Sequence, residues 1–268
     1  NFLNDKFDFV DYQSNKKIVF PIKINPIIVK ENIGHHKKSL KLRDNFIPFM
    51  KGLLAEGRSI IEKDFKNNNK GLFCAASQSH LMDQIIKILF EKYNKFPNVS
   101  HDFSLIAIGG YGRRELAPFS DIDLLFLVGS KKNSNRDKLI NTILYSLWDL
   151  NLKVGYSTRN IDQIIEDIKK DLNFRTSILD QRHIVGSKNL FQKLKNGFKK
   201  IQKNTTSEFV TLKLKEQEKR HKNIANSIYM LEKNIKESKG CLRDLNTMFW
   251  ILKYQYRVSN ILEIKTFD

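Results

Sequence analysis

The 268-residue sequence has no long hydrophobic run and only two cysteines. Its longest apolar stretches, residues 124–128 and 248–252, are far shorter than the ~20 residues that a membrane-spanning helix requires, so we expect no membrane protein. Cys74 and Cys241 lie too far apart in the sequence to suggest a disulfide framework. No apolar segment follows a basic start, so no secretory signal is visible. Together these absences predict a cytoplasmic protein.

The composition is that of a globular protein, with 41% hydrophobic and 28% charged residues. Lys and Arg number 47 against 29 Asp and Glu, a net charge of +18 that suggests a phosphate-rich partner. The excess of basic residues is mostly lysine, in a chain that is also rich in Asn, Ile and Phe. An AT-rich coding sequence would produce the same amino-acid bias without selection for a binding partner. Because the chain begins at Asn1 and ends at Asp268, just after an apolar helical pattern, we expect a fragment of a longer protein.

Hydrophobic periodicity predicts an α+β fold. Residues 35–66 and 78–93 repeat apolar side chains at the helical spacing, whereas 103–108 and 121–128 are short apolar runs typical of buried strands. A helix over 133–150, a third strand over 152–158 and a helix from Asn160 to Lys170 follow. Beyond Gly186 only amphipathic helical patterns remain. We therefore expect an N-terminal arm (1–34), a small mixed sheet with flanking helices (35–186) and an all-helical domain (187–268).

The most informative segment, residues 106–127, reads IAIGGYGRRELAPFSDIDLLFL. Gly109 and Gly110 directly follow a predicted strand, where glycine lets the backbone bend and lets an anionic ligand approach the main-chain N–H groups. The alternative interpretation is an ordinary turn after the strand, in which two consecutive glycines are also common. The guanidinium groups of Arg113 and Arg114 are suited to phosphate oxygens, although a salt bridge with Glu115 is the alternative.

Asp121 and Asp123 begin the second predicted strand. Side chains alternate along a strand, so both carboxylates are expected on one face, with Ile122 on the other. Two neighbouring carboxylates repel each other unless a cation lies between them, and Mg²⁺ takes one or two carboxylates plus the phosphates of its substrate. A strand, a glycine turn, basic residues and paired carboxylates in this order fit metal-dependent nucleotidyl transfer. No Walker-type loop is present, which argues against a P-loop ATPase.

The segment 109–127 resembles the signature of the DNA-polymerase-β-like nucleotidyltransferase superfamily, and its residue pattern is similar to that of the bacterial PII uridylyltransferases. The similarity extends over residues 35–260. Gly57-Arg58 and Leu81-Met82-Asp83 resemble the leading helices of that family, and Val154-Gly155 with Ser157 and Arg159 resembles the strand after its motif. Asp180 with Arg182 and Gly186 resembles the next helix of the family, and 239–244 with Trp250 is similar to its glycine-rich LRD segment.

This resemblance implies a polymerase-β-like core and transfer of UMP from UTP to a tyrosine of the PII nitrogen-regulatory protein, with release of pyrophosphate. It implies that Mg²⁺ is held by Asp121 and Asp123, the catalytic residues, and that the nucleotide is bound by Gly109, Gly110, Arg113 and Ser120. The HD and ACT domains of full-length members are not visible, and His101-Asp102 is expected to serve as a cap or turn.

The sequence departs from the family pattern at three points. Cys241 with Ser238-Lys239 stands where the family has a Gly-Pro-Gly-Gly run, so the local loop geometry is expected to differ. Tyr156 replaces a histidine and is expected to be a buried aromatic residue. A third metal-binding carboxylate is not evident, because 153–158 contains no acid; Asp149 and Asp180 are the candidates.

Two alternative functions remain open. An RNA nucleotidyltransferase of the CCA-adding or poly(A) type shares the glycine and Asp-x-Asp core and would use the net charge of +18 directly. Clustered aromatic residues are missing from the basic stretches, which argues against a nucleic-acid partner. A catalytically silent binding module is the other alternative, although such a module has no reason to keep two carboxylates that repel each other.

Overall fold

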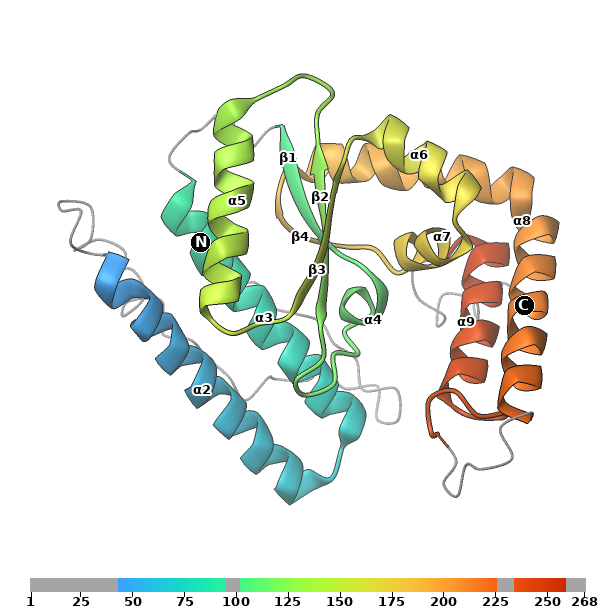
Figure 1. Cartoon of the computed structure of the whole chain (residues 1–268), viewed down its shortest axis with the longest axis horizontal. Coiled ribbons are helices and arrows are strands. Elements are labelled where there is room, and N and C mark those ends of the chain that lie inside the picture. The colour runs from blue at the N-terminus through green and yellow to red at the C-terminus, as the bar shows by residue number, and fades with distance from the viewer. Residues whose placement is uncertain (1–42, 95–101, 226–233, 259–268) are drawn as a thin grey trace. The chain divides into compact units, whose positions relative to one another are not determined.

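The structure, a computed structural model, describes residues 43–94, 102–225 and 234–258 (Figure 1). The chain divides into two compact units. One comprises residues 1–160 and 181–190, and the other comprises 161–180 and 191–268. The boundary predicted after residue 186 leaves 161–180 with the sheet, whereas the structure groups these residues with the helical unit. The predicted N-terminal arm lies outside the described residues.

The first unit is a mixed sheet with helices, as the sequence predicts. Its helices are α2 (Arg43–Asn68), α3 (Gly71–Tyr93), the single turn α4 (Gly109–Gly112) and α5 (Ser134–Asp149). Its strands are β1 (Phe103–Ala107), β2 (Ile122–Val128), β3 (Val154–Arg159) and β4 (Arg182–Gly186). The start of α5 is fixed by the Asn133 side chain, which accepts hydrogen bonds from the backbone N–H groups of Asn135 and Arg136.

The four strands lie in the order β3-β2-β1-β4. β1 is antiparallel to both β2 and β4, whereas β2 and β3 are parallel. A parallel pair needs a crossover connection, and α5 supplies it. β2 is therefore an interior strand with hydrogen-bonded neighbours on both sides, and β3 is an edge strand of the sheet that the described residues form.

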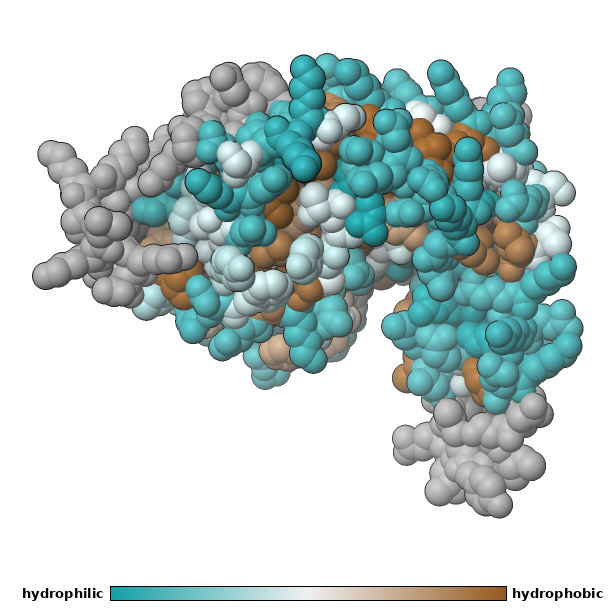
Figure 2. Space-filling view, turned by 45° about the horizontal axis from the view of Figure 1, so that its top comes forward, coloured by the Kyte–Doolittle hydropathy of each residue, from teal (hydrophilic) through white to brown (hydrophobic). Residues whose placement is uncertain are grey.

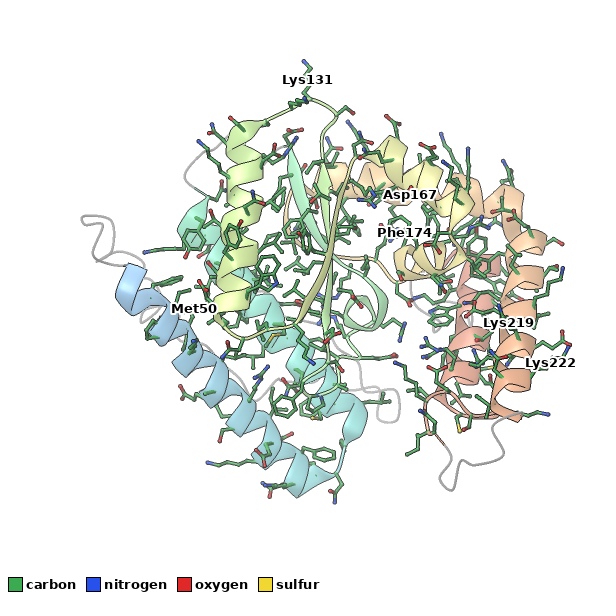
Figure 3. All side chains as sticks on the ribbon, in the orientation of Figure 1. Met50, Lys131, Asp167, Phe174, Lys219 and Lys222 are labelled. Carbon is green, nitrogen blue, oxygen red and sulfur yellow. The ribbon has the colours of Figure 1, made fainter. Side chains whose placement is uncertain are left out.

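One face of the sheet carries the hydrophobic core. Leu105, Leu124 and Phe126 point to this face and belong to one buried cluster with residues of α2, α3 and α5. Figure 1 shows α3 and α5 along this face, and side chains fill the space between helices and strands in Figure 3, where Met50 of α2 is labelled and is fully buried. Along β2 only Asp123 is exposed. Because the core covers the face that carries Leu124 and Phe126, the Asp123 carboxylate lies on the opposite face of the sheet.

The strand β4 was not predicted. The sequence comparison placed Asp180–Gly186 in a helix, and this expectation is wrong, because Arg182–Gly186 pairs with β1. Arg182 lies opposite Ala107, and Val185 lies opposite Leu105. The strand is short and begins with two polar residues, so its hydrophobic pattern is too weak to predict a strand. Its extended conformation depends on the hydrogen bonds that it forms with β1.

The second unit is helical in all of its described elements, as predicted. They are α6 (Ile161–Lys170), α7 (Leu172–Leu179), α8 (Lys188–Ala225), whose first three residues belong to the other unit, and α9 (Leu242–Tyr256). Tyr254 of α9 stacks on Phe209 of α8 at 3.9 Å between ring centroids.

Among the helices of the described residues, none combines the length and the apolar character that a membrane span needs. The surface in Figure 2 is mostly hydrophilic.

A buried ion pair joins α9 to the end of α7. Asp180, whose side chain is fully buried, accepts hydrogen bonds from Lys253 Nζ (2.5 Å) and Trp250 Nε1 (2.7 Å). Asp180 is thus engaged inside the helical unit, which argues against its expected candidacy as a metal ligand. Asp149, the other candidate, is exposed at the last residue of α5.

We expect Asp180→Ala to destabilise the protein by about 3 kcal/mol or more, because it leaves the charge of Lys253 buried without its carboxylate. The matched variant Asp149→Ala removes an exposed carboxylate and should change the free energy of unfolding by less than about 0.5 kcal/mol. Urea denaturation of both variants measures the difference. Equal effects would contradict the structural role of Asp180.

Candidate active site

The two sequence-predicted aspartates are neighbours on the exposed face of β2. Asp123 is the second residue of the strand and Asp121 precedes it, and both are exposed while Ile122 between them is buried. Although the residue is exposed, partial burial of its carboxyl group raises the pKa of Asp123, and the negative charge of Asp121 raises it further. Like charges held together in this way create a place for a cation.

Asp123 is enclosed by two glycines from different elements. A Cβ atom on Gly155, its register partner on β3, would lie 2.6 Å from Asp123 Oδ1. A Cβ atom on Gly109 would lie 3.4 Å from Oδ2, and Gly109 has a φ of +60° that disfavours other residues. The carboxylate therefore occupies space that side chains at both positions would take.

The predicted glycine turn is the helical turn α4. Gly112 N–H donates to Ile108 O and Arg113 N–H donates to Gly109 O, both at 3.0 Å. Ile108 N–H in turn donates to Asp123 O at 3.1 Å, which ties the start of the turn to the backbone of β2. The first N–H groups of a helical turn have no acceptor within it, so this turn offers donors close to the carboxylates.

The predicted phosphate-binding side chains lie in and after this turn. Arg113 Nε donates to Glu115 Oε2 at 2.7 Å, so the salt bridge that the sequence left as an alternative is formed. Arg114 has a φ of +65°, and burial, followed by the charge of Arg182, lowers its pKa to about 10. Ser120 is exposed, and its N–H donates to Ala117 O.

A buried polar network that the sequence did not identify as part of the site holds the turn from behind. Arg182 of β4 donates to both carboxylate oxygens of Asp83 on α3, at 2.6 and 3.1 Å. It also donates to the backbone carbonyls of Tyr111 and Gly112 at 3.0 and 3.2 Å. The Tyr111 hydroxyl donates to Asp83 at 2.7 Å. One arginine therefore connects α3, α4 and β4.

Electrostatics support the charged state of this network. Burial alone would raise the pKa of Asp83, but the charge and hydrogen bonds of Arg182 outweigh it and hold the pKa below its usual value. In the sequence, the only local signal for this network is that the charged Asp83 lies among the apolar repeats Leu81, Ile85 and Ile88. Nothing local in the sequence indicated that its partner lies 99 residues away.

The described residues contain no group of three or more His, Cys, Asp or Glu side chains placed to hold a metal. Two carboxylates nevertheless suit Mg²⁺, because substrate phosphates and water complete its coordination. Asp102 pairs with Arg136 at 2.8 Å, which is a structural role, whereas His101 lies outside the described residues. Tyr156 is half exposed, at 50%, so the expectation of a buried aromatic residue is wrong.

In the helical unit, the LRD segment is organised around Asp244. This carboxylate accepts hydrogen bonds from Gly240 N–H (2.7 Å), from Gln217 (2.9 Å) and from Arg220, and it pairs with His221 at 2.9 Å. Burial raises the pKa of Asp244, but these hydrogen bonds outweigh it and hold the pKa well below the usual value. Asp244 therefore fixes the glycine loop that precedes α9.

Comparisons with known proteins find a matching family model and relatives that cover most of this chain. A family model described as GlnD PII-uridylyltransferase matches residues 208–267. A bifunctional uridylyltransferase/uridylyl-removing enzyme from Azospirillum brasilense is 40% identical over 238 residues, which is 85% of this chain and 25% of that protein. A protein of the same name from Rhodopseudomonas palustris is 38% identical over 237 residues, 86% of this chain and 26% of that protein. The chain thus spans about a quarter of the length of these relatives.

We expect Asp83→Asn to destabilise the protein by about 3 kcal/mol, because it leaves the charge of Arg182 uncompensated in the interior. Glu91→Gln, an exposed change on the same helix, should have almost no effect on the free energy of unfolding in urea. A loss below about 1 kcal/mol for Asp83→Asn would show that the pair does not hold the turn.

If Asp121 and Asp123 hold a divalent cation, as the sequence predicts, Gly155→Ala should weaken its binding about tenfold, because the new methyl group must displace the Asp123 carboxylate. The affinity is measured by the electron paramagnetic resonance signal of free Mn²⁺ as the protein is titrated with this ion. Gly52→Ala is the matched control, since nothing lies within 4 Å of its added Cβ atom. Unchanged Mn²⁺ affinity in both variants would contradict the placement of Asp123.

Proposed function

This chain belongs to the PII-uridylyltransferase family, and from that premise we propose that it transfers UMP from UTP to a tyrosine hydroxyl of a PII protein. The hydroxyl oxygen forms a bond to the α-phosphorus of UTP as the bond from this phosphorus to the bridging oxygen breaks. Pyrophosphate leaves, and the hydroxyl proton passes to water. Atoms and charge balance without a further reactant.

The position of Asp123 is the observation that carries this proposal. Its carboxylate extends from an interior strand, beside the charge of Asp121 and between the backbones of Gly109 and Gly155. A surface carboxylate without a ligand needs no such enclosure, and burial next to a like charge costs stability. A site that binds a cation and a phosphate chain accounts for both features.

The residues of the site have distinct proposed roles. Asp121 and Asp123 would hold Mg²⁺, which when bound neutralises the charge that develops on the phosphates and activates the attacking oxygen. The N–H groups of Gly109 and Gly110 would approach the triphosphate. Arg113, oriented by Glu115, would pair with the phosphate oxygens, and the exposed Ser120 would contact the nucleotide.

We expect Asp123→Asn to lower the rate of UMP transfer on the order of 10³-fold, because the remaining carboxylate no longer holds the cation. Transfer is measured with UTP labelled at the α-phosphate and purified PII protein. Asp162→Asn, which neutralises an exposed carboxylate in the first turn of α6, is the control and should leave the rate unchanged. Full transfer by Asp123→Asn would exclude this mechanism.

The same assay separates the alternative functions. Replacing UTP with ATP, CTP or GTP reports nucleotide choice, and replacing PII with tRNA or oligoadenylate tests an RNA acceptor. Salt-sensitive transfer to RNA would favour the RNA nucleotidyltransferase. Nucleotide binding without transfer to any acceptor would favour the silent module.

A further inference from the structure

The outer edge of β3 combines two features that favour a protein partner. Among the described residues, β3 pairs only with β2, so its other side presents backbone N–H and C=O groups that another chain can pair with. Beside this edge lies an aromatic patch formed by Tyr145 and Trp148 of α5 and Tyr156 of β3. β3 runs in front of the other strands in Figure 1.

The aromatic patch is exposed and continuous. Tyr145, Trp148 and Tyr156 are 55%, 42% and 50% exposed. The ring centroids of Tyr145 and Trp148 lie 5.7 Å apart, and those of Trp148 and Tyr156 lie 6.0 Å apart. Tyr and Trp are enriched at the centres of protein interfaces, where their large and rigid rings are buried at low entropic cost.

The strand register connects the patch to the candidate active site. Gly155 lies opposite Asp123, and Tyr156 lies opposite Leu124. Alternation places Gly155 on the face of the carboxylates and Tyr156 on the face of α5. One further strand beside β3 would lie ~4.8 Å from it, and its side chains would alternate between the same two faces.

We propose that a segment of the protein acceptor docks as an added strand on the outer edge of β3. The acceptor residue beside Gly155 presents its hydroxyl to the Asp121–Asp123 site, and the residues next to it contact the aromatic patch. Peptide recognition by strand addition takes affinity from main-chain hydrogen bonds and specificity from alternate side chains. This inference rests on the proposed function, because it assumes a protein acceptor.

The position of the edge favours the acceptor over other occupants. An acceptor hydroxyl must reach the phosphate bound at Asp123, and only the backbone of Gly155, without a side chain, separates that carboxylate from the β3 edge. A strand added there is continuous with the site. A second copy of this chain pairing through the same edge is the competing occupant, and it is one outcome of the test.

The test uses the full-length protein with UTP and purified PII. Tyr145→Ala, Trp148→Ala and their combination should raise the KM for PII about tenfold or more in the double variant. The KM for UTP at saturating PII and the affinity for UTP measured without PII should not change, because UTP binding does not need the acceptor. Tyr256→Ala, which removes a similarly exposed aromatic residue from α9 (41%), is the matched control and should leave all three values unchanged.

Hydrogen exchange tests the strand addition itself. Binding of PII should slow amide exchange within 154–159, because the outward N–H groups gain acceptors. An unchanged KM for PII in the double variant, or unchanged exchange at β3, would overturn the inference. Equal losses for PII and UTP would also overturn it, since the patch would then act through the fold.

The remaining outcomes separate this inference from the proposed function. A concentration-dependent dimer in sedimentation velocity that the double variant abolishes would assign the edge to a second copy and overturn acceptor docking. Full transfer by Asp123→Asn would instead refute the proposed function, whatever the aromatic patch does.

Discussion

The buried pair of Asp83 and Arg182 is the constraint on which the first unit depends. Its members come from α3 and β4, 99 residues apart in the sequence, and the same guanidinium also holds two carbonyls of the turn between β1 and β2. A buried ion pair is tolerated only when its hydrogen-bonding groups are satisfied, and here the carbonyls and the Tyr111 hydroxyl complete the set. The shape of the glycine turn is therefore set by tertiary structure as well as by its glycines.

The turn is tied to the strand that carries Asp123. Ile108 N–H is bonded to the carbonyl of Asp123, and β2 has strands on both sides. The backbone of the turn and the backbone of β2 at Asp123 cannot shift without breaking ladder hydrogen bonds or the buried network. Such preorganisation is what a site for a cation and a phosphate requires, because the geometry is present before any ligand arrives.

The sequence predicts most of this architecture where the signals are local. The alternation of Asp121, Ile122 and Asp123 predicts the face on which each side chain lies, and the structure has both carboxylates exposed and the isoleucine buried. The α+β class and the helical second unit follow from periodicity. β4 and the partnership of Asp83 with Arg182 do not, because both depend on contacts between distant segments. Tyr156 is half exposed and not buried, because its strand pairs with β2 alone among the described residues, and the local sequence does not show how many neighbours a strand has.

The crossover through α5 has a consequence for how such a protein can diversify. The parallel pairing of β2 with β3 places Tyr145, Trp148, Tyr156 and Gly155 on one continuous stretch, 134–159, whereas the glycine turn and the aspartates lie entirely upstream at 109–123. Substitutions at Tyr145, Trp148 and Tyr156 can change the aromatic patch without changing the turn or the aspartates, whereas Gly155 must stay small because it faces Asp123. The aromatic patch can therefore vary in evolution independently of the two aspartates, and Gly155 is the one position of the later stretch at which the two constraints meet.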